Sequence, residues 1–369
     1  MTNPELRPPA GTPIAAVMPE SSEESATVVN TQIPHTVRPS SPASSDGDSD
    51  REVIEPDEDL LNGLPHEVED IDLVQLRIQS ISALNLSRFT KLQNLCLREN
   101  LVREIDGLDA VGPHLHELDL YDNRISVIEN LGPEEGDGVW VNLENLDLSF
   151  NKIKRIRHVS HLKNLRNLYF VQNKITKIEN LDGLKYLTNL ELGGNRLREL
   201  ENLDSLTRLT QLWVGKNKIT RLQNLGALKN LKILSIQANR IVKLENLDEL
   251  EALEELYISH NGIEKIEGLE KNKNLKILDI TSNRVTHLEN LKHLHNLEEI
   301  WASNNRLESF DEIEEQLKGI STLETVYFEG NPLQVKDPMS YRNKVRLHLG
   351  TGLRQIDATY ITESQAGIR

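Results

Sequence analysis

The chain has 369 residues, of which 37% are hydrophobic, and a formal net charge of −16 at pH 7. The single cysteine, Cys96, excludes a scaffold of internal disulfides, and no stretch approaches the ~18 apolar residues of a membrane-spanning helix. An acidic pI near 5.2, without a visible basic stripe, argues against nucleic acid as the main partner.

Residues 1–61 differ in composition from the rest of the chain. They are rich in Ser and Pro and then acidic, as in PSSPASSDGDSDREVIEPDEDL. The first 60 residues hold twelve Asp or Glu and three Lys or Arg, so they carry about −9 of the net charge. Such a segment cannot bury enough apolar surface to order itself, and we expect a disordered acidic tail. The N-terminus also lacks an apolar signal segment, which predicts an intracellular protein.

From residue 62 to about residue 335, one pattern repeats every 22 residues. Its frame is L-x-x-L-x-L-x-x-N followed by I/L-x-x-I/L-x-x-L, as in LTNLELGGNRLRELENL (187–203). The asparagines of the frame are Asn100, Asn123, Asn151, Asn173, Asn195, Asn217, Asn239, Asn261, Asn283, Asn305 and Asn331. Eleven such copies in register identify leucine-rich repeats, and one degenerate copy makes about twelve.

Each frame predicts a short strand followed by a tight turn. The x-L-x-L-x part alternates with period two, so its two leucines face the same way. The later part steps by three, which suits a 3-10 or short α turn. The Asn at the corner is expected to bond backbone groups of its own turn and of neighbouring coils. The copies should therefore stack into a curved α/β solenoid, with a parallel sheet on the concave face and these turns on the convex face.

The ends and one insertion depart from the frame. The copy at residues 73–84 has Leu76 in place of the Asn, as expected of a terminal repeat that faces solvent. The segment GPEEGDGVW (132–140) stretches one spacing from 22 to 28, and we expect it to bulge from the convex side. Residues 336–369 resemble a leucine-rich-repeat cap and tail, with a helix around residues 341–349 over the last coil.

No motif in the chain indicates catalysis. A phosphate-binding glycine loop, H-E-x-x-H, C-x-x-C and a nucleophile elbow are all absent from the sequence. The pairs His114/His116 and His293/His295 are interpreted as ordinary surface histidines, so we predict no metal site and no cofactor. Cys96 lacks the basic neighbours that activate a thiol. We expect a protein that is not an enzyme.

One strand position carries an unusual set of side chains. In NLYFVQNKITKIENL (167–181), alternation sends Leu168 and Phe170 into the core and Tyr169 onto the concave sheet. The same column of the stack holds Cys96, Asp119, Asp147, Tyr169, Glu191, Trp213, Ser235, Tyr257, Asp279, Trp301 and Tyr327. It contains two of the three Trp, three of the seven Tyr, four acidic residues and no Lys or Arg. The neighbouring column adds Glu117, Glu255 and Glu299.

Strand propensity explains some aromatic residues in this column but not the acidic ones, because Asp is depleted in strands. Trp and Tyr with a rim of one charge sign are typical of protein-binding surfaces. Eleven strands about 4.8 Å apart give an inner surface of roughly 50 Å, which suits a globular domain of about 300 residues. We interpret the column as a docking face for a globular partner with a basic surface, on a chain that is monomeric by itself.

Several segments are specific rather than generic repeat sequence. They are LCLRENL (95–101), LDLYDNRI (118–125), VGKNKIT (214–220), ELYISHNGIEKIEGLE (255–270) and the ending LETVYFEGNPLQ…YRNKVRLHLGTGLRQIDAT. Over about residues 70–360 the chain resembles the family of protein phosphatase 1 regulatory subunit 7, which has 22-residue intracellular leucine-rich repeats.

The resemblance implies a non-catalytic regulatory subunit in the nucleus and cytoplasm, which docks the catalytic subunit of protein phosphatase 1 on its concave face and controls its activity or targeting. The positions that match the family's docking residues are Asp147, Tyr169, Glu191, Trp213, Asp279, Glu299, Trp301 and Tyr327, and the column itself adds Tyr257. No nucleic-acid or membrane partner is expected. The alternative is a structural leucine-rich-repeat adaptor of the cytoskeleton or axoneme, since 22-residue repeats also occur there.

Overall fold

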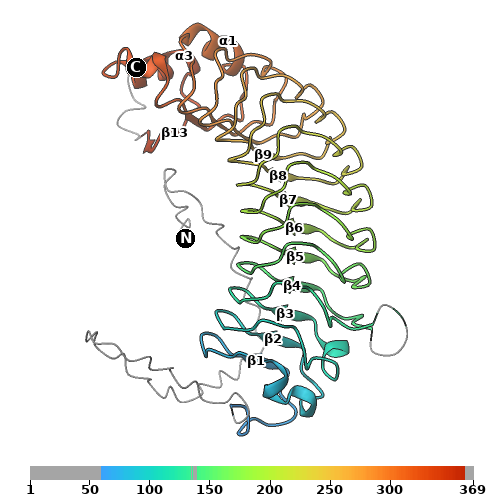
Figure 1. Cartoon of the computed structure of the whole chain (residues 1–369). Helices are drawn as coiled ribbons and strands as arrows, with labels where there is room; N and C mark the ends of the chain where they lie inside the picture. Colours follow the sequence, from blue (N-terminus) through green and yellow to red (C-terminus); the bar gives the residue numbers. More distant parts are fainter. Residues whose placement is uncertain (1–59, 134, 136–138, 362–369) are drawn as a thin grey trace, which may run out of the picture. The chain divides into compact units, whose positions relative to one another are not determined.

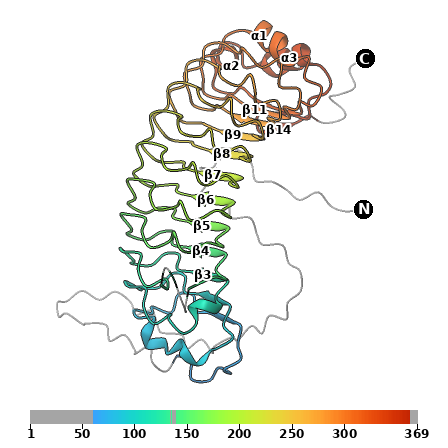
Figure 2. The same cartoon turned by 90° about the vertical axis from the view of Figure 1, so that its right-hand side faces the viewer.

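The computed structural model describes residues 60–133, 135 and 139–361. These residues belong to one compact unit, and the predicted acidic tail, 1–61, lies almost wholly outside them. The unit is a curved stack of coils with one strand per coil (Figures 1 and 2). Its fourteen strands form one sheet in chain order, parallel from β1 to β13, with an antiparallel pair at the end. The predicted leucine-rich-repeat solenoid is confirmed.

The strands are β1 (Asp70–Asp72), β2 (Asn94–Cys96), β3 (Glu117–Asp119), β4 (Asn145–Asp147), β5 (Asn167–Tyr169), β6 (Asn189–Glu191), β7 (Gln211–Trp213), β8 (Ile233–Ser235), β9 (Glu255–Tyr257), β10 (Ile277–Asp279), β11 (Glu299–Trp301), β12 (Thr325–Tyr327), β13 (Gln355–Ile356) and β14 (Thr359–Tyr360). The helices are η2 (Ser82–Leu84), η3 (Leu86–Arg88), η4 (Gly112–His114), α1 (Phe310–Leu317), α2 (Pro332–Val335) and α3 (Tyr341–Leu349).

The strands are short because each coil must turn back within 22 residues. The middle residue of every strand from β1 to β12 points into the core and is at most 3% exposed, and Leu168 in β5 is 0% exposed. Phe170, two residues later, is also 0% exposed. This alternation matches the prediction, and it leaves the first and third residue of each strand on the concave side.

The convex side is made of turns closed by hydrogen bonds between residues three apart. In one coil the Leu184 N–H donates to the Leu181 carbonyl at 3.0 Å, and the Leu187 N–H donates to the Leu184 carbonyl at 3.2 Å. This is the 3-10 pattern that the spacing of three predicted. Most coils nevertheless keep these as single turns, and the described helices lie near the two ends of the stack (Figure 1).

The repeat asparagines bond as expected from the sequence. Asn173 is 7% exposed and accepts the Ile153 N–H through Oδ1 at 2.9 Å. Its Nδ2 donates to the carbonyls of Leu148, at 2.8 Å, and Phe170, at 3.2 Å. Each such amide therefore joins its own turn to the preceding coil, and satisfies backbone groups that the sheet leaves unpaired.

A second asparagine ladder runs through the convex turns, at the Asn of the recurring ENL triplet. Asn180 donates through Nδ2 to the Ile156 carbonyl at 2.7 Å, and Asn202 bonds Ile178 in the same way at 2.6 Å. Asn180 has φ 60° and Asn202 has φ 56°, in the left-handed region that Asn tolerates better than most residues. These positions therefore select Asn for both its backbone and its side chain.

The insertion behaves differently from the prediction. Residues 134 and 136–138 are not described, but Trp140, at its end, is 1% exposed. A Cβ on Gly112 would lie 1.9 Å from the Trp140 ring, so the indole fills space that only glycine leaves open. The expectation of a simple outward bulge was wrong for this residue, because one end of the insertion is anchored in the core.

The last coil is covered by helices. The predicted helix over residues 341–349 is present as α3, and it packs against α1 (Figure 1). The ring of Phe310 stacks on His348, with centroids 5.7 Å apart, and His348 Nδ1 lies 2.7 Å from Glu314 Oε2. Val345 is fully buried in this contact region.

Among the helices that the structure describes, none has the length and apolar composition needed to cross a membrane.

Candidate protein-docking surface

The predicted column forms one continuous row across the concave sheet. In-register pairing places Asp147 beside Tyr169, Tyr169 beside Glu191 and Glu191 beside Trp213. Farther along, Tyr257, Asp279, Trp301 and Tyr327 are neighbours in turn. Glu299 lies in the adjacent row, at the start of β11. The structure thus brings all nine predicted site residues onto one surface.

Four aromatic side chains of the row form a continuous array. Trp213 stacks on Tyr257, with centroids 6.5 Å apart and an interplanar angle of 18°. Tyr257 lies 6.0 Å from Trp301, and Trp301 lies 5.9 Å from Tyr327 in an edge-on arrangement. All four rings are half-buried. Ser235 lies between Trp213 and Tyr257 in the row, and Asp279 lies between Tyr257 and Trp301; they are 4% and 5% exposed. Their short side chains let the rings on either side come into contact across two strand spacings.

Each ring of this aromatic array is held by a polar side chain nearby. The Trp301 Nε1–H donates to Glu299 Oε2 at 2.9 Å, and the Tyr257 hydroxyl donates to Glu255 Oε2 at 2.7 Å. Trp213 bonds Gln211 at 3.3 Å in the same relation, while Tyr327 accepts a bond from Gln355. Glu255, although named in the neighbouring column, was not among the predicted site residues, and neither were Gln211 and Gln355. For the first two, the signal was available, since residues two apart in a strand share a face.

The acidic residues are less accessible than the sequence suggested. Asp147, Glu191 and Asp279 are 7%, 9% and 5% exposed, so the expectation of an exposed acidic rim was wrong for them. Asp147 Oδ1 accepts the Ser149 N–H at 2.7 Å, and Asp279 Oδ1 accepts the Thr281 N–H at 2.9 Å. These aspartates cap the loop that follows their strand, which explains why Asp occurs in a strand despite its low propensity.

Burial also disfavours the ionised form of these carboxyls. Burial, and then the nearby Asp119, raises the pKa of Asp147 to about 6. Burial raises the pKa of Glu191 and of Asp279 as well. Their negative charge is therefore costly to maintain in the free protein, and a cationic group placed against them would lower that cost.

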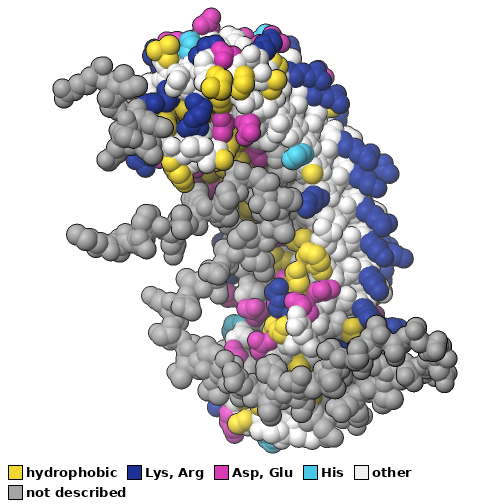
Figure 3. All heavy atoms as spheres, turned by 90° about the vertical axis from the view of Figure 1, so that its left-hand side faces the viewer, with side chains coloured by type: hydrophobic (Ala, Val, Ile, Leu, Met, Phe, Trp, Pro, Cys, Tyr) yellow, Lys and Arg dark blue, Asp and Glu magenta, His cyan; other side chains and the backbone are white. Residues whose placement is uncertain are grey.

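Tyr169 stands apart from the aromatic array. Its row neighbours are Asp147 and Glu191, and burial raises the pKa of its hydroxyl. The row accordingly divides into an acidic half around Tyr169 and an aromatic half from Trp213 to Tyr327. Figure 3, seen from the concave side, shows acidic and hydrophobic side chains gathered on this face, with Lys and Arg along one long side of the stack.

A cation reaches the acidic half from the loops. Arg98 pairs with Asp119 at 2.9 Å, and its guanidinium lies 4.1 Å from the centre of the Tyr121 ring. Tyr121 in turn lies 4.8 Å from Phe150. The column itself contains no Lys or Arg, so the sequence did not indicate that Arg98 partly neutralises the charge of Asp119. It reduces the net negative potential at the N-terminal end of the row.

The described residues offer little for chemistry. No three His, Cys, Asp or Glu side chains among them are grouped so that they could hold a metal ion. Burial raises the pKa of the Cys96 thiol to about 12, so the reactive thiolate is scarce at neutral pH. The row instead presents a partly apolar surface of ordered aromatic rings.

The leucine-rich-repeat families match the chain directly. The family described as "Leucine-rich repeat" covers residues 110–215, and the family "Leucine Rich repeats (2 copies)" covers residues 207–249 and 251–294. Among solved structures, an internalin of Listeria monocytogenes has a TM-score of 0.60 at 21% identity, over 83% of this chain and 89% of that one. A leucine-rich-repeat protein of Leptospira interrogans has a TM-score of 0.56 at 23% identity, over 74% and 80%. These likenesses show the fold alone.

Curated relatives are more similar over shorter segments. Protein phosphatase 1 regulatory subunit SDS22 of Saccharomyces cerevisiae is 52% identical over 117 residues, 31% of this chain and 33% of that protein. Its namesake in Schizosaccharomyces pombe is 56% identical over 84 residues, 23% and 24% of the two chains. Protein phosphatase 1 regulatory subunit 7 of Mus musculus is 62% identical over 47 residues, 13% and 12%. The matched segments thus span a third or less of these relatives. The chain is a leucine-rich-repeat protein that resembles, over those segments, the regulatory subunits of protein phosphatase 1.

Proposed function

We propose that this chain is a non-catalytic regulatory subunit of protein phosphatase 1. It docks the catalytic subunit on its concave face and controls the activity or targeting of that enzyme. The residues of the docking face are Asp147, Tyr169, Glu191, Trp213, Tyr257, Asp279, Glu299, Trp301 and Tyr327. The yeast and mouse relatives are named as regulatory subunits of protein phosphatase 1, which supports the choice of phosphatase.

The aromatic array carries the proposal. Trp213, Tyr257, Trp301 and Tyr327 form a chain of ring contacts 5.9–6.5 Å apart, and all four remain half-exposed. The hydrogen bonds to Gln211, Glu255 and Glu299 fix three of these rings before any partner arrives. A preorganised aromatic surface loses little conformational entropy on binding, and buried Trp and Tyr dominate interface energies.

The dimensions suit a globular partner. From β7 to β12 the array crosses five strand spacings, about 24 Å at ~4.8 Å each, and the parallel stack from β1 to β12 crosses about 53 Å. A short peptide would leave most of this row exposed. A partner with a basic patch would also pair with the acidic half, where Asp147 and Glu191 lie.

Calorimetric titration of the full chain with purified phosphatase catalytic subunit tests the proposal, and size-exclusion chromatography then checks for a one-to-one complex. A saturable complex with heat of binding is expected. The absence of a complex, together with co-sedimentation on polymerised microtubules, would instead favour the cytoskeletal or axonemal adaptor. Phosphatase activity assayed with and without the chain then distinguishes inhibition from targeting.

A further inference from the structure

A line of basic side chains follows the strand ends, where the sequence appeared to hold no basic stripe. The residue directly after the repeat Asn is Arg or Lys in eight of the eleven copies. These residues, called the basic ridge here, are Arg124, Lys152, Lys174, Arg196, Lys218, Arg240, Arg284 and Arg306. The expectation of no basic stripe was therefore wrong, because the charges are 22 or more residues apart in sequence and meet only in the stack.

The backbone fixes the ridge rigidly, one residue per coil. The Arg196 N–H donates to the Ile175 carbonyl of the preceding coil at 2.8 Å, and the Lys218 N–H donates to Leu197 in the same way at 2.8 Å. The bond recurs in each coil from Arg124 to Arg306. The spacing of the charges therefore follows the strand spacing of about 4.8 Å.

The ridge differs sharply from the basic column next to it. Three residues farther along four of the coils, a second set of basic residues, called the paired column here, forms ion pairs with the following coil. Arg155, Lys177, Arg221 and Lys243 pair with Glu179, Glu201, Glu245 and Glu267, at 2.9, 3.7, 3.1 and 3.6 Å. Within the part of the chain that the structure describes, the ridge residues have no carboxylate within 4.0 Å. Six of the eight are exposed, and Lys174 and Lys218 are half-exposed.

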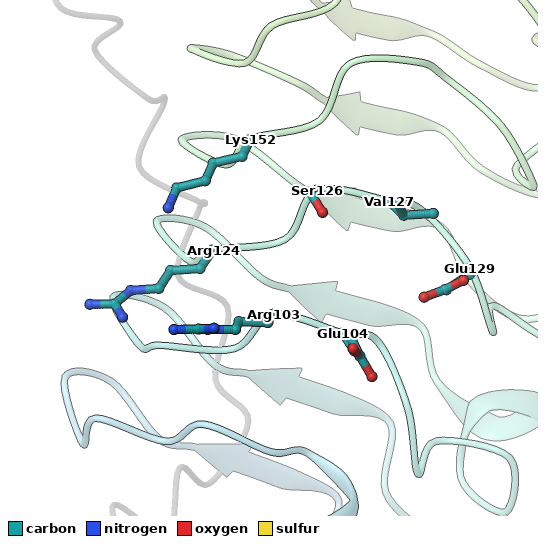
Figure 4. A pocket seen from close by; sticks show the side chains of 7 residues that line it. All are labelled: Arg103, Glu104, Arg124, Ser126, Val127, Glu129 and Lys152. Carbon is teal, nitrogen blue, oxygen red and sulfur yellow. The ribbon is translucent and has the colours of Figure 1, made fainter.

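The start of the ridge shows how these side chains lie. A shallow open pocket there is lined by the ridge residues Arg124 and Lys152 and by Arg103 of the preceding coil, which is not part of the ridge, with Glu104 and Glu129 among its other residues. In Figure 4 the three cationic ends extend past the ends of the strands, while the two glutamates lie on the opposite side of the pocket. The cations thus face outward together, separated from the acids of their own coils.

We propose that the basic ridge binds an extended acidic segment of a protein partner, independently of the concave face. The unpaired line is one side chain wide, and Glu104 and Glu129 line the same pocket as its first two members, Arg124 and Lys152. A broad anion such as a duplex or an anionic bilayer would meet those glutamates as well, which opposes its binding. Single-stranded nucleic acid is disfavoured because the ridge positions hold no aromatic ring on which bases could stack.

The length of the occupant follows from the geometry. Arg124 to Arg306 spans eight coil spacings, or about 38 Å, which an extended chain covers with about twelve residues at ~3.3 Å each. Gly262 interrupts the line, and a Cβ there would lie 3.1 Å from Val242 Cγ1. The uninterrupted part, Arg124 to Arg240, is about 24 Å long and matches about seven residues. Carboxylates or phosphates spaced along such a segment would each meet a fixed cation.

A labelled oligo-glutamate peptide of about twelve residues tests the proposal, titrated against the full chain by fluorescence anisotropy. The triple variant Arg196→Gln, Lys218→Gln, Arg240→Gln should weaken peptide binding by about tenfold or more. The matched control Lys177→Gln, Arg221→Gln, Lys243→Gln removes the same charge from the paired column, and should weaken it less than about twofold. Both variants should keep the wild-type melting temperature and the wild-type affinity for the phosphatase catalytic subunit.

Three results would overturn the proposal. Equal weakening in the two triple variants would mean that the peptide responds only to net charge. Failure of the wild-type chain to bind the peptide at about 50 mM salt, where screening is weak, would remove the site. Tighter, ridge-dependent binding of an oligothymidylate or of phosphatidylserine vesicles would assign the ridge to nucleic acid or membrane instead.

Discussion

The indole Nε1–H of Trp301 donates a 2.9 Å hydrogen bond to Oε2 of Glu299, two residues earlier in β11. The relation recurs for Tyr257 with Glu255 and for Trp213 with Gln211. In each case the ring lies half-exposed, but its polar atom is satisfied inside the chain. A partner can then cover the ring without desolvating an unpaired donor, which makes the apolar area fully available for binding.

Trp301→Ala should weaken binding of the phosphatase catalytic subunit by about 30- to 1,000-fold, equivalent to ~2–4 kcal/mol for a central aromatic anchor. The variant should remain folded, because Trp301 is only half-buried. Calorimetric titration measures the affinity. Tyr186→Ala is the matched control, since Tyr186 is 42% exposed in a convex turn and packs on Arg208 instead. Wild-type affinity of the Trp301 variant would place the docking surface elsewhere.

Two variants of Glu299 should distinguish its role in orienting the Trp301 ring from the effect of its negative charge. Glu299→Gln keeps an oxygen that accepts the Trp301 N–H, whereas Glu299→Ala leaves the indole without this partner. If orientation is what Glu299 contributes, the Gln variant should bind the phosphatase within about twofold of wild type and the Ala variant about tenfold more weakly. Equal losses in calorimetric titration of both variants would show that the carboxylate charge matters instead.

Substitutions at two adjacent residues of β5 should affect folding stability and phosphatase binding separately. Leu168→Ala should cost about 2–5 kcal/mol of unfolding free energy, because the fully buried side chain leaves a cavity. Tyr169→Ala should cost far less stability but weaken phosphatase binding. Urea denaturation and calorimetric titration of both variants give the two quantities. A Tyr169 variant that loses as much stability as the Leu168 variant would mean that this ring supports the sheet rather than a partner.

The repeat made the coil architecture predictable from the sequence. From β4 to β11 a strict 22-residue period sets the register of the strands, so the row from Asp147 to Trp301 follows directly from the sequence, and the repeat frame extends it to Tyr327, 26 residues later. The burial of Trp140 was not predictable in the same way. Its partner, Gly112, lies 28 residues earlier, and nothing in the insertion's composition points to that glycine.

Side-chain exposure and pairing were harder to predict than position. The sequence placed Asp147 on the concave face, but not its bond to the Ser149 N–H or its 7% exposure. Likewise, Arg221 and Lys218 look equivalent in sequence, although Arg221 pairs with Glu245 and Lys218 forms no ion pair with the described residues. These distinctions depend on distances between coils, which a one-dimensional pattern does not contain.

The repeat amides offer a direct test of what joins the coils. Asn173→Ala should reduce the unfolding free energy by about 2–4 kcal/mol, because it leaves the Ile153 N–H and the Leu148 carbonyl without their partner in a buried site. Asn164→Ala is the control, since Asn164 is exposed and donates one bond, to the Val141 carbonyl at 2.6 Å. Its loss should stay below about 1 kcal/mol. If urea denaturation showed the same loss of unfolding free energy in both variants, the repeat asparagines would have no special role in joining the coils.

Asp147 should make stability depend on pH in the mildly acidic range. Its folded-state pKa of about 6 lies above the ordinary value of 3.8, because of burial and the nearby Asp119. The unfolded chain therefore releases this proton first, and the stabilisation by the protonated form is lost as pH rises from about 4 to about 6. Asp147→Asn keeps an acceptor for the Ser149 N–H but cannot ionise, so at pH 7.5 it should be more stable than wild type by up to about 3 kcal/mol.

Below pH 4 the Asp147→Asn variant and the wild type should have the same stability, and the exposed control Asp182→Asn should follow wild type throughout. Urea denaturation across this range decides it, and a difference that does not change with pH would show that Asp147 is ionised at little cost.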